Sequence, residues 1–143
     1  MRKSRICVGV VFGGKSGEHD VSIQSAKTVL AALKEGINEK VYKLFPIYID
    51  LEGRWWGPPL AKEVLRNGSA LSNKDLPQPI PPQGFRSFPE GHEAIDIWYP
   101  VIHGPNGEDG TIQGLFKLTG KPFIGPGVLA SALGMDKIAM KAA

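Results

Sequence analysis

The chain has 143 residues, of which 42% are hydrophobic and 22% are charged, and its formal net charge at pH 7 is +3. This length and composition are typical of one globular domain. No apolar run approaches the roughly 18–20 residues that cross a bilayer, and the basic residues are scattered, so we expect neither a membrane nor a nucleic acid as a partner. The basic N-terminus leads into glycines rather than a signal-peptide cleavage site, which predicts a cytoplasmic protein with Cys7 as a buried thiol.

The first half of the chain predicts two strands and two helices. Residues 6–12 form a near-continuous apolar run, which is typical of a central parallel strand. From Val21 the apolar residues recur at helical spacing as far as residue 37, and residues 44–49 form a second β-prone run. Residues 58–67 predict a short helix, because a proline stands at its start and Gly68 follows its end.

The second half of the chain continues this alternation after an irregular segment. Residues 69–90 contain five prolines and predict a surface loop, with a short strand at 85–88. Residues 95–102 predict a strand, residues 111–118 a helix and residues 121–124 a further short strand. The whole pattern predicts an α/β fold, a Rossmann-like open, mainly parallel sheet flanked by helices.

The last predicted helix begins at residue 128 and runs to Ala143 without a stop signal. Its final residues are good helix formers, and neither glycine nor proline ends it. We therefore expect a fragment of a longer chain. Residues 1–125 would form one substrate-binding α/β domain, and residues 126–143 would begin the next region.

Residues 9–16 satisfy the pattern G-x-x-x-x-G-K-[ST] of a phosphate-binding P-loop, in which Lys15 would contact phosphates. That site needs a loop between its glycines, so that backbone N–H groups face the phosphates. Residues 10–12 are instead strong strand formers. We favour a strand through residue 12 and a tight turn that begins at Gly13, with a P-loop module as the alternative.

Glu18 lies close to the N-terminus of the first predicted helix, which Ser16 or Asp20 would cap. Two interpretations stay open from the spacing alone. Glu18 either complements the helix dipole, or faces the crevice beyond the strand ends and binds a cation such as a substrate ammonium group.

His103 directly follows the predicted strand 95–102 and precedes a loop rich in glycine and acidic residues. If the first and third strands are adjacent, His103 and Glu18 converge on one pocket. We place His19 and His92 at the surface. No pair of histidine, cysteine or carboxylate residues has metal-ligand spacing outside flexible loops, so no metal site is predicted.

Three blocks of the sequence resemble D-alanine–D-alanine ligases. Residues 11–22, VFGGKSGEHDVS, resemble the N-terminal signature of that family. His103-Gly104, followed by GEDGTIQG at 107–114, resembles its second signature. PFIG, ASA and MDK within residues 122–137 resemble the entry to its ATP-grasp region. The three blocks occur in the family's order and frame nearly the whole chain, although residues 53–93 match no motif.

The resemblance implies the N-terminal domain of a cytoplasmic enzyme of peptidoglycan synthesis. Such a ligase activates one D-alanine with ATP as an acyl phosphate, which a second D-alanine attacks. Glu18 and His103 match catalytic residues that bind the first D-alanine, and Val21 lies beside them in the substrate site. Lys137 matches a lysine that contacts ATP phosphates.

The resemblance also implies a homodimer, and ATP and Mg²⁺ (or Mn²⁺) bound mainly by regions beyond Ala143. The 143 residues alone are therefore expected not to catalyse ligation. Gly17 stands where alanine is frequent in the family, and Asp20 where glutamate is frequent. Asp20 also occurs in ligases that make D-alanyl-D-lactate, so a ligase of that type is an alternative. A non-catalytic binding domain is a further one.

Overall fold

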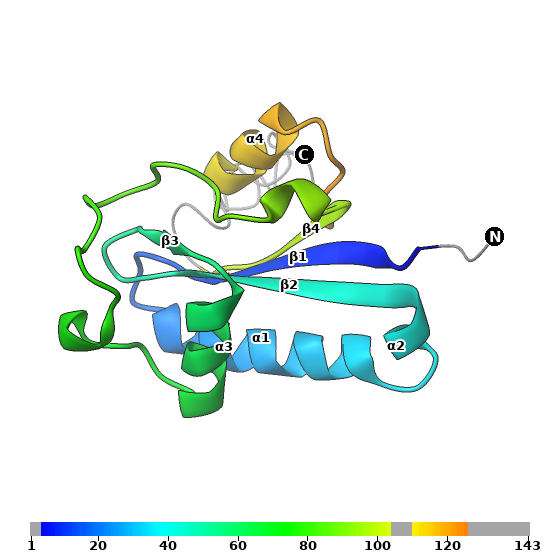
Figure 1. The fold of residues 1–143 in the computed structure, drawn as a ribbon, viewed down its shortest axis with the longest axis horizontal. Helices are drawn as coiled ribbons and strands as arrows, with labels where there is room; N and C mark the ends of the chain where they lie inside the picture. The colour runs from blue at the N-terminus through cyan, green and yellow to red at the C-terminus, as the bar shows by residue number, and fades with distance from the viewer. Residues whose placement is uncertain (1–3, 104–109, 126–143) are drawn as a thin grey trace, which may run out of the picture.

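The computed structural model describes residues 4–103 and 110–125, which form an α/β domain (Figure 1). Its sheet has the strand order β3–β2–β1–β4. The strands are β1 (Ile6–Gly13), β2 (Tyr42–Ile49), β3 (Trp55–Trp56) and β4 (Ile97–Val101). β1 pairs in parallel with both β2 and β4, and β3 is an antiparallel edge strand. The predicted open, mainly parallel sheet is confirmed.

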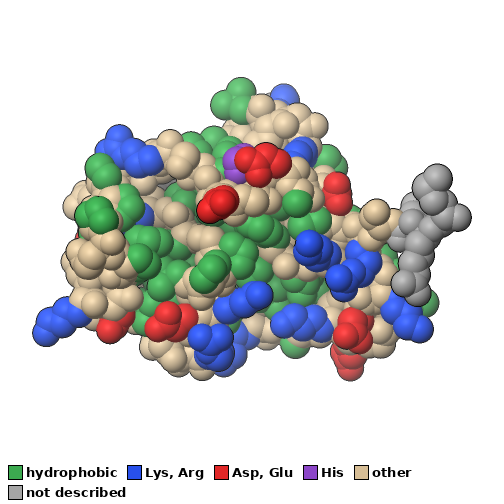
Figure 2. All heavy atoms as spheres, in the orientation of Figure 1, with side chains coloured by type: hydrophobic (Ala, Val, Ile, Leu, Met, Phe, Trp, Pro, Cys, Tyr) green, Lys and Arg blue, Asp and Glu red, His purple; other side chains and the backbone are tan. Residues whose placement is uncertain are grey.

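Helices cover both faces of this sheet (Figure 1). One face carries α1, α2 and α3, and the other carries α4. The helices are α1 (His19–Lys34), α2 (Asn38–Val41), α3 (Pro58–Asn67) and α4 (Thr111–Leu118), with 3-10 helices at Asn73–Asp75 and His92–Ala94. Figure 2 shows charged side chains gathered along the α1 side of the molecule. No helix in the described part of the chain is long and apolar enough to cross a membrane.

The central strand β1 contributes to two apolar cores, because its successive side chains point to opposite faces of the sheet. Val8, Val10 and Phe12 pack in the core beneath α1 and α3. Cys7 and Val11 pack in the core on the α4 side. A strand that is covered on both faces is apolar at nearly every position, which explains the uninterrupted run in the sequence. Cys7 is buried as predicted, and burial raises the pKa of its thiol.

Gly9 lies inside β1 and serves packing rather than phosphate binding. A Cβ atom at this position would come within 2.8 Å of Ile95 Cδ1 and 3.0 Å of Trp98 Cε3. Residues 9–12 are strand, so their N–H groups are not arranged around a phosphate. The P-loop alternative, which needs this segment as a loop in front of Lys15, is therefore wrong.

Several element boundaries differ from the predictions. The first helix begins earlier, at His19, and ends at Lys34, because Gly36 separates it from the short α2. The predicted strand at 85–88 is absent, because Phe85 and Phe88 pack edge-on against a β3 tryptophan instead of pairing with a strand.

The short strand predicted at 121–124 is reduced to a single parallel bridge between Phe123 and Trp98. The backbone N–H of Trp98 donates to the Pro122 carbonyl at 2.9 Å, and the N–H of Ile124 donates to the Trp98 carbonyl at 2.8 Å. The helices predicted at 58–67 and 111–118 are confirmed. The one predicted from residue 128 lies outside the described residues.

Candidate functional site

The turn between β1 and α1 lies at the carboxyl edge of the parallel strands. Gly13, the last residue of β1, and Gly14 have φ angles of 95° and 102°, which favour glycine. A Cβ atom on Gly13 would lie 2.2 Å from the carbonyl oxygen of Ile49 in β2. The N–H of Gly14 donates to that same oxygen at 2.8 Å. Backbone conformation and close approach together therefore require glycine at position 13.

Ser22, on the buried side of α1, connects this turn to strand β4. Its hydroxyl oxygen accepts the N–H of Gly13 at 2.8 Å and donates to the carbonyl of Val101. The start of α1 and the ends of β1 and β4 are thus joined by one side chain. Ser22 was not among the predicted site residues, although a serine among the apolar positions of a predicted helix is a usable signal for a buried hydrogen bond.

Glu18 occupies the N-cap position of α1 and is exposed. Its carboxylate makes no hydrogen bond or ion pair with the described residues. The prediction that Ser16 or Asp20 caps this helix is wrong, since no side chain caps it. Ser16 has a different role, because its hydroxyl accepts the Glu18 N–H at 3.2 Å and donates to the His103 carbonyl at 3.1 Å.

His103 lies against α1, on the helix face that also carries Glu18 at its N-terminal end. The condition for their convergence is met, because β4 lies beside β1. The His103 Nε2 atom is 3.2 Å from the Ser25 hydroxyl. Residues 18, 21 and 25 are three and seven positions apart, which places them on one helix face. Val21 is 56% exposed there, so an exposed apolar side chain lies on the same helix face as the exposed carboxylate of Glu18.

His19 is not at the surface, and that prediction is wrong. It is only 3% exposed, because the first turn of α1 directs it toward β2. Its Nδ1 atom lies 2.6 Å from the Gly14 carbonyl oxygen, and its Nε2 atom lies 2.8 Å from the Tyr48 hydroxyl. No local pattern around residue 19 indicated this burial. His92 is half-buried and stacks on Phe88.

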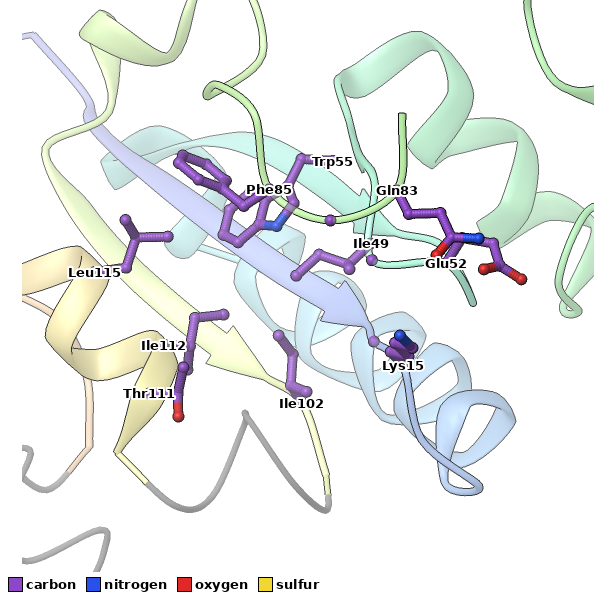
Figure 3. A pocket seen from close by; sticks show the side chains of 13 residues that line it. Lys15, Ile49, Glu52, Trp55, Gln83, Phe85, Ile102, Thr111, Ile112 and Leu115 are labelled. Carbon is purple, nitrogen blue, oxygen red and sulfur yellow. The ribbon is translucent and has the colours of Figure 1, made fainter. Parts of the chain in front are cut away.

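A cleft of about 550 Å³ opens beside the glycine turn (Figure 3). Its side chains are mainly apolar: Ile49, Trp55, Phe85, Ile102, Ile112 and Leu115. Lys15 and Glu52 carry the charges of the lining. Neither Glu18 nor His103 lines this cleft, so these two residues, which are predicted to bind D-alanine, lie outside it.

Residues 9–16 do not form a phosphate site for ATP. Residues 9–13 of the P-loop match belong to strand β1, and Lys15 is exposed on the turn that follows the strand. Within residues 4–103 and 110–125, no three histidine, cysteine or carboxylate residues are grouped to hold a metal ion. Lys137, the residue predicted to contact ATP, lies outside the described residues.

The fold and the site define a class of protein. It is an α/β domain that presents polar side chains at the carboxyl ends of two adjacent parallel strands, where such sheets bind small ligands. The family model for the N-terminus of D-ala D-ala ligase matches residues 7–126. The chain therefore belongs to the family of D-alanine–D-alanine ligase N-terminal domains.

Individual relatives agree with this assignment. The chain is 62% identical over all 143 residues to the D-alanine–D-alanine ligase of Synechococcus sp. (strain CC9605), and it spans 40% of that protein's length. The VanG D-Ala:D-Ser ligase from Enterococcus faecalis aligns with 95% of the chain and 40% of its own, at 36% identity and a TM-score of 0.69. The Bacillus anthracis D-alanine–D-alanine ligase complexed with ATP aligns with 98% of the chain and 34% of its own, at 25% identity and a TM-score of 0.63.

Proposed function

We propose that the chain is the N-terminal substrate-binding domain of a D-alanine–D-alanine ligase. The whole enzyme joins two D-alanines with ATP, through a D-alanyl phosphate, in the synthesis of peptidoglycan precursors. The observation that carries this proposal is the exposed carboxylate of Glu18 at the start of α1, beside Val21 and His103, in a chain of this family. The domain occupies residues 1–125, and residues 126–143 begin the central ATP-grasp region.

Glu18, Val21 and His103 together bind the first D-alanine. The carboxylate of Glu18 pairs with the substrate ammonium group, a charge-assisted contact that fixes one end of a small molecule. The exposed side chain of Val21 contacts the substrate methyl group. The His103 ring, oriented by Ser25, closes the same subsite. A substrate held at several points reacts with a smaller entropic cost, which is the contribution of this domain to the reaction.

ATP and Mg²⁺ bind mainly outside this domain, where Lys137 neutralises phosphate charge. The strand conformation of residues 9–12 supports this division of labour, because it excludes a phosphate-binding loop in front of Lys15. The enzyme is cytoplasmic and works as a homodimer, both by analogy with the family. A solved relative that acts on D-Ala and D-Ser has the same N-terminal fold, so selection of the second substrate is assigned to later domains.

The direct test of this function is D-alanine-dependent release of ADP by the full-length enzyme. D-Alanyl-D-alanine should be the product. D-Lactate offered together with D-alanine should give little mixed product, whereas a dominant depsipeptide would favour the D-alanine–D-lactate alternative. Absence of ligation in a folded full-length protein would contradict the proposal and favour a binding domain.

Calorimetry of the 143-residue chain with ATP tests the nucleotide site separately. We expect no micromolar binding, because the residues before Lys15 are strand rather than a phosphate loop. Lys15→Ala should therefore change the titration no more than Lys27→Ala, which alters an exposed lysine on α1. Micromolar ATP affinity that is lost only in Lys15→Ala would contradict the assignment of this turn to the amino acid.

A further inference from the structure

His19 and Tyr48 form a buried polar pair directly beneath the glycine turn. Tyr48 is fully buried, and the two rings meet edge to face with their centroids 5.3 Å apart. The His19 ring bridges two partners, with Nδ1 at 2.6 Å from the Gly14 carbonyl oxygen and Nε2 at 2.8 Å from the Tyr48 hydroxyl. The pair therefore connects α1, the turn and β2.

The partners determine the direction of both hydrogen bonds. A carbonyl oxygen only accepts, so His19 Nδ1 carries the hydrogen that is donated to Gly14. A ring that carries its one hydrogen on Nδ1 accepts at Nε2, where the Tyr48 hydroxyl can donate. Burial, followed by the nearby Asp50 carboxylate, raises the pKa of Tyr48, so its phenol keeps this hydrogen at neutral pH. Both ring nitrogens of His19 thus have a partner of the right kind.

Residues of strand β2 hold Gly14 through the N–H group and the carbonyl group of its backbone. Ile49 accepts the Gly14 N–H at 2.8 Å, and the adjacent Tyr48 acts on the Gly14 carbonyl through His19. His19 is the first residue of α1 and directly follows Glu18. The buried His19 ring therefore anchors the backbone at the start of α1, directly beside Glu18 and its exposed carboxylate.

We propose that His19 and Tyr48 are positioning residues that set the Glu18 carboxylate for the ammonium group of the first D-alanine. The proposal rests on the function assigned above. Neither residue touches the substrate, since both are buried beneath the turn. Their loss should therefore weaken binding of the first D-alanine, with little change in binding of the second.

The test compares tyrosine variants at the two ends of β2 in the full-length ligase. Tyr48→Phe removes the hydroxyl and keeps the ring contacts with His19 and Phe12. It should raise the KM for the first D-alanine by up to about tenfold, because the free energy of a typical intramolecular hydrogen bond limits the size of the effect. Tyr42→Phe, at the opposite end of the same strand, should leave that KM unchanged.

A second pair of variants removes the ring of His19. Asparagine retains an amide N–H that can replace Nδ1 as donor to the Gly14 carbonyl, whereas leucine retains no donor. His19→Asn should therefore have a smaller effect on the KM for the first D-alanine than His19→Leu. Equal effects of the two variants would contradict the positioning role. This comparison still tests the proposal if Tyr48→Phe folds poorly.

A double-mutant cycle with Glu18→Gln separates positioning from general loosening of the fold. If Tyr48 acts through the Glu18 carboxylate, the Tyr48→Phe effect on this KM should largely disappear in the Glu18→Gln background. The same fold-change in both backgrounds would overturn the inference. If Glu18→Gln raises this KM and Tyr48→Phe does not, the positioning role is overturned and the proposed substrate site stands. If Glu18→Gln leaves this KM unchanged, the proposed substrate site itself is overturned.

Discussion

Replacing Glu18 with glutamine in the full-length ligase should raise the KM for the first D-alanine roughly 10- to 150-fold. This range corresponds to about 1.5–3 kcal/mol, the usual contribution of a hydrogen bond to a charged group. Glutamine keeps the size of the side chain and removes the charge that pairs with the substrate ammonium. Initial rates measured over a range of D-alanine concentrations separate the KM values of the two substrate sites.

Asp20→Asn is the matched control for this variant. Asp20 is a second exposed carboxylate in the first turn of α1, two residues beyond Glu18 and therefore on a different helix face. If Glu18 only complements the helix dipole, both variants should lower the free energy of unfolding by about 0.3–1 kcal/mol and neither should change the KM. Such a result would remove Glu18 from the substrate site.

Alanine at position 13 should lower the free energy of unfolding of the 143-residue chain by about 3 kcal/mol or more. Left-handed backbone at an alanine already carries a cost of about 1–3 kcal/mol. The added Cβ atom would also lie 2.2 Å from the Ile49 carbonyl oxygen, so the backbone of β1 or β2 must shift. Urea unfolding followed by circular dichroism measures the difference.

Gly17→Ala provides the comparison within the same turn. Gly17 has open space where a Cβ atom would be placed, and its φ angle lies outside the left-handed region. Alanine there should change the free energy of unfolding by less than about 0.5 kcal/mol. Similar losses in Gly13→Ala and Gly17→Ala would show that the close approach to Ile49 is not what destabilises the first variant.

The features that were predictable from sequence depend on neighbours along the chain. The uninterrupted apolar run of β1 indicated a strand covered on both faces. The bounds of α3 followed from Pro58 at its start and from Gly68 after its end, where the backbone is left-handed. Glu18 was a candidate because it lies near the start of the first predicted helix, and His103 because it directly follows a predicted buried strand. The parallel arrangement of β1 and β4 brings both strand ends to one edge.

The errors have a common physical origin in contacts between distant segments. Phe85 and Phe88 have the composition of a strand, but their rings pack against Trp55 and their backbone pairs with no strand. His19 stands in a polar stretch of sequence, yet the rotation of α1 buries it against Tyr48, 29 residues away.

The strand and helix types, the parallel sheet and the two segments that carry the candidate site all follow from the amino-acid sequence. These depend on apolar periodicity and on backbone conformations special to glycine and proline, which are local properties. The polar groups that hold the glycine turn became identifiable only from the folded arrangement of the chain. Ser22 and His19 find their partners in β4 and β2, because a buried hydrogen-bonding group must be satisfied by whatever the fold brings beside it.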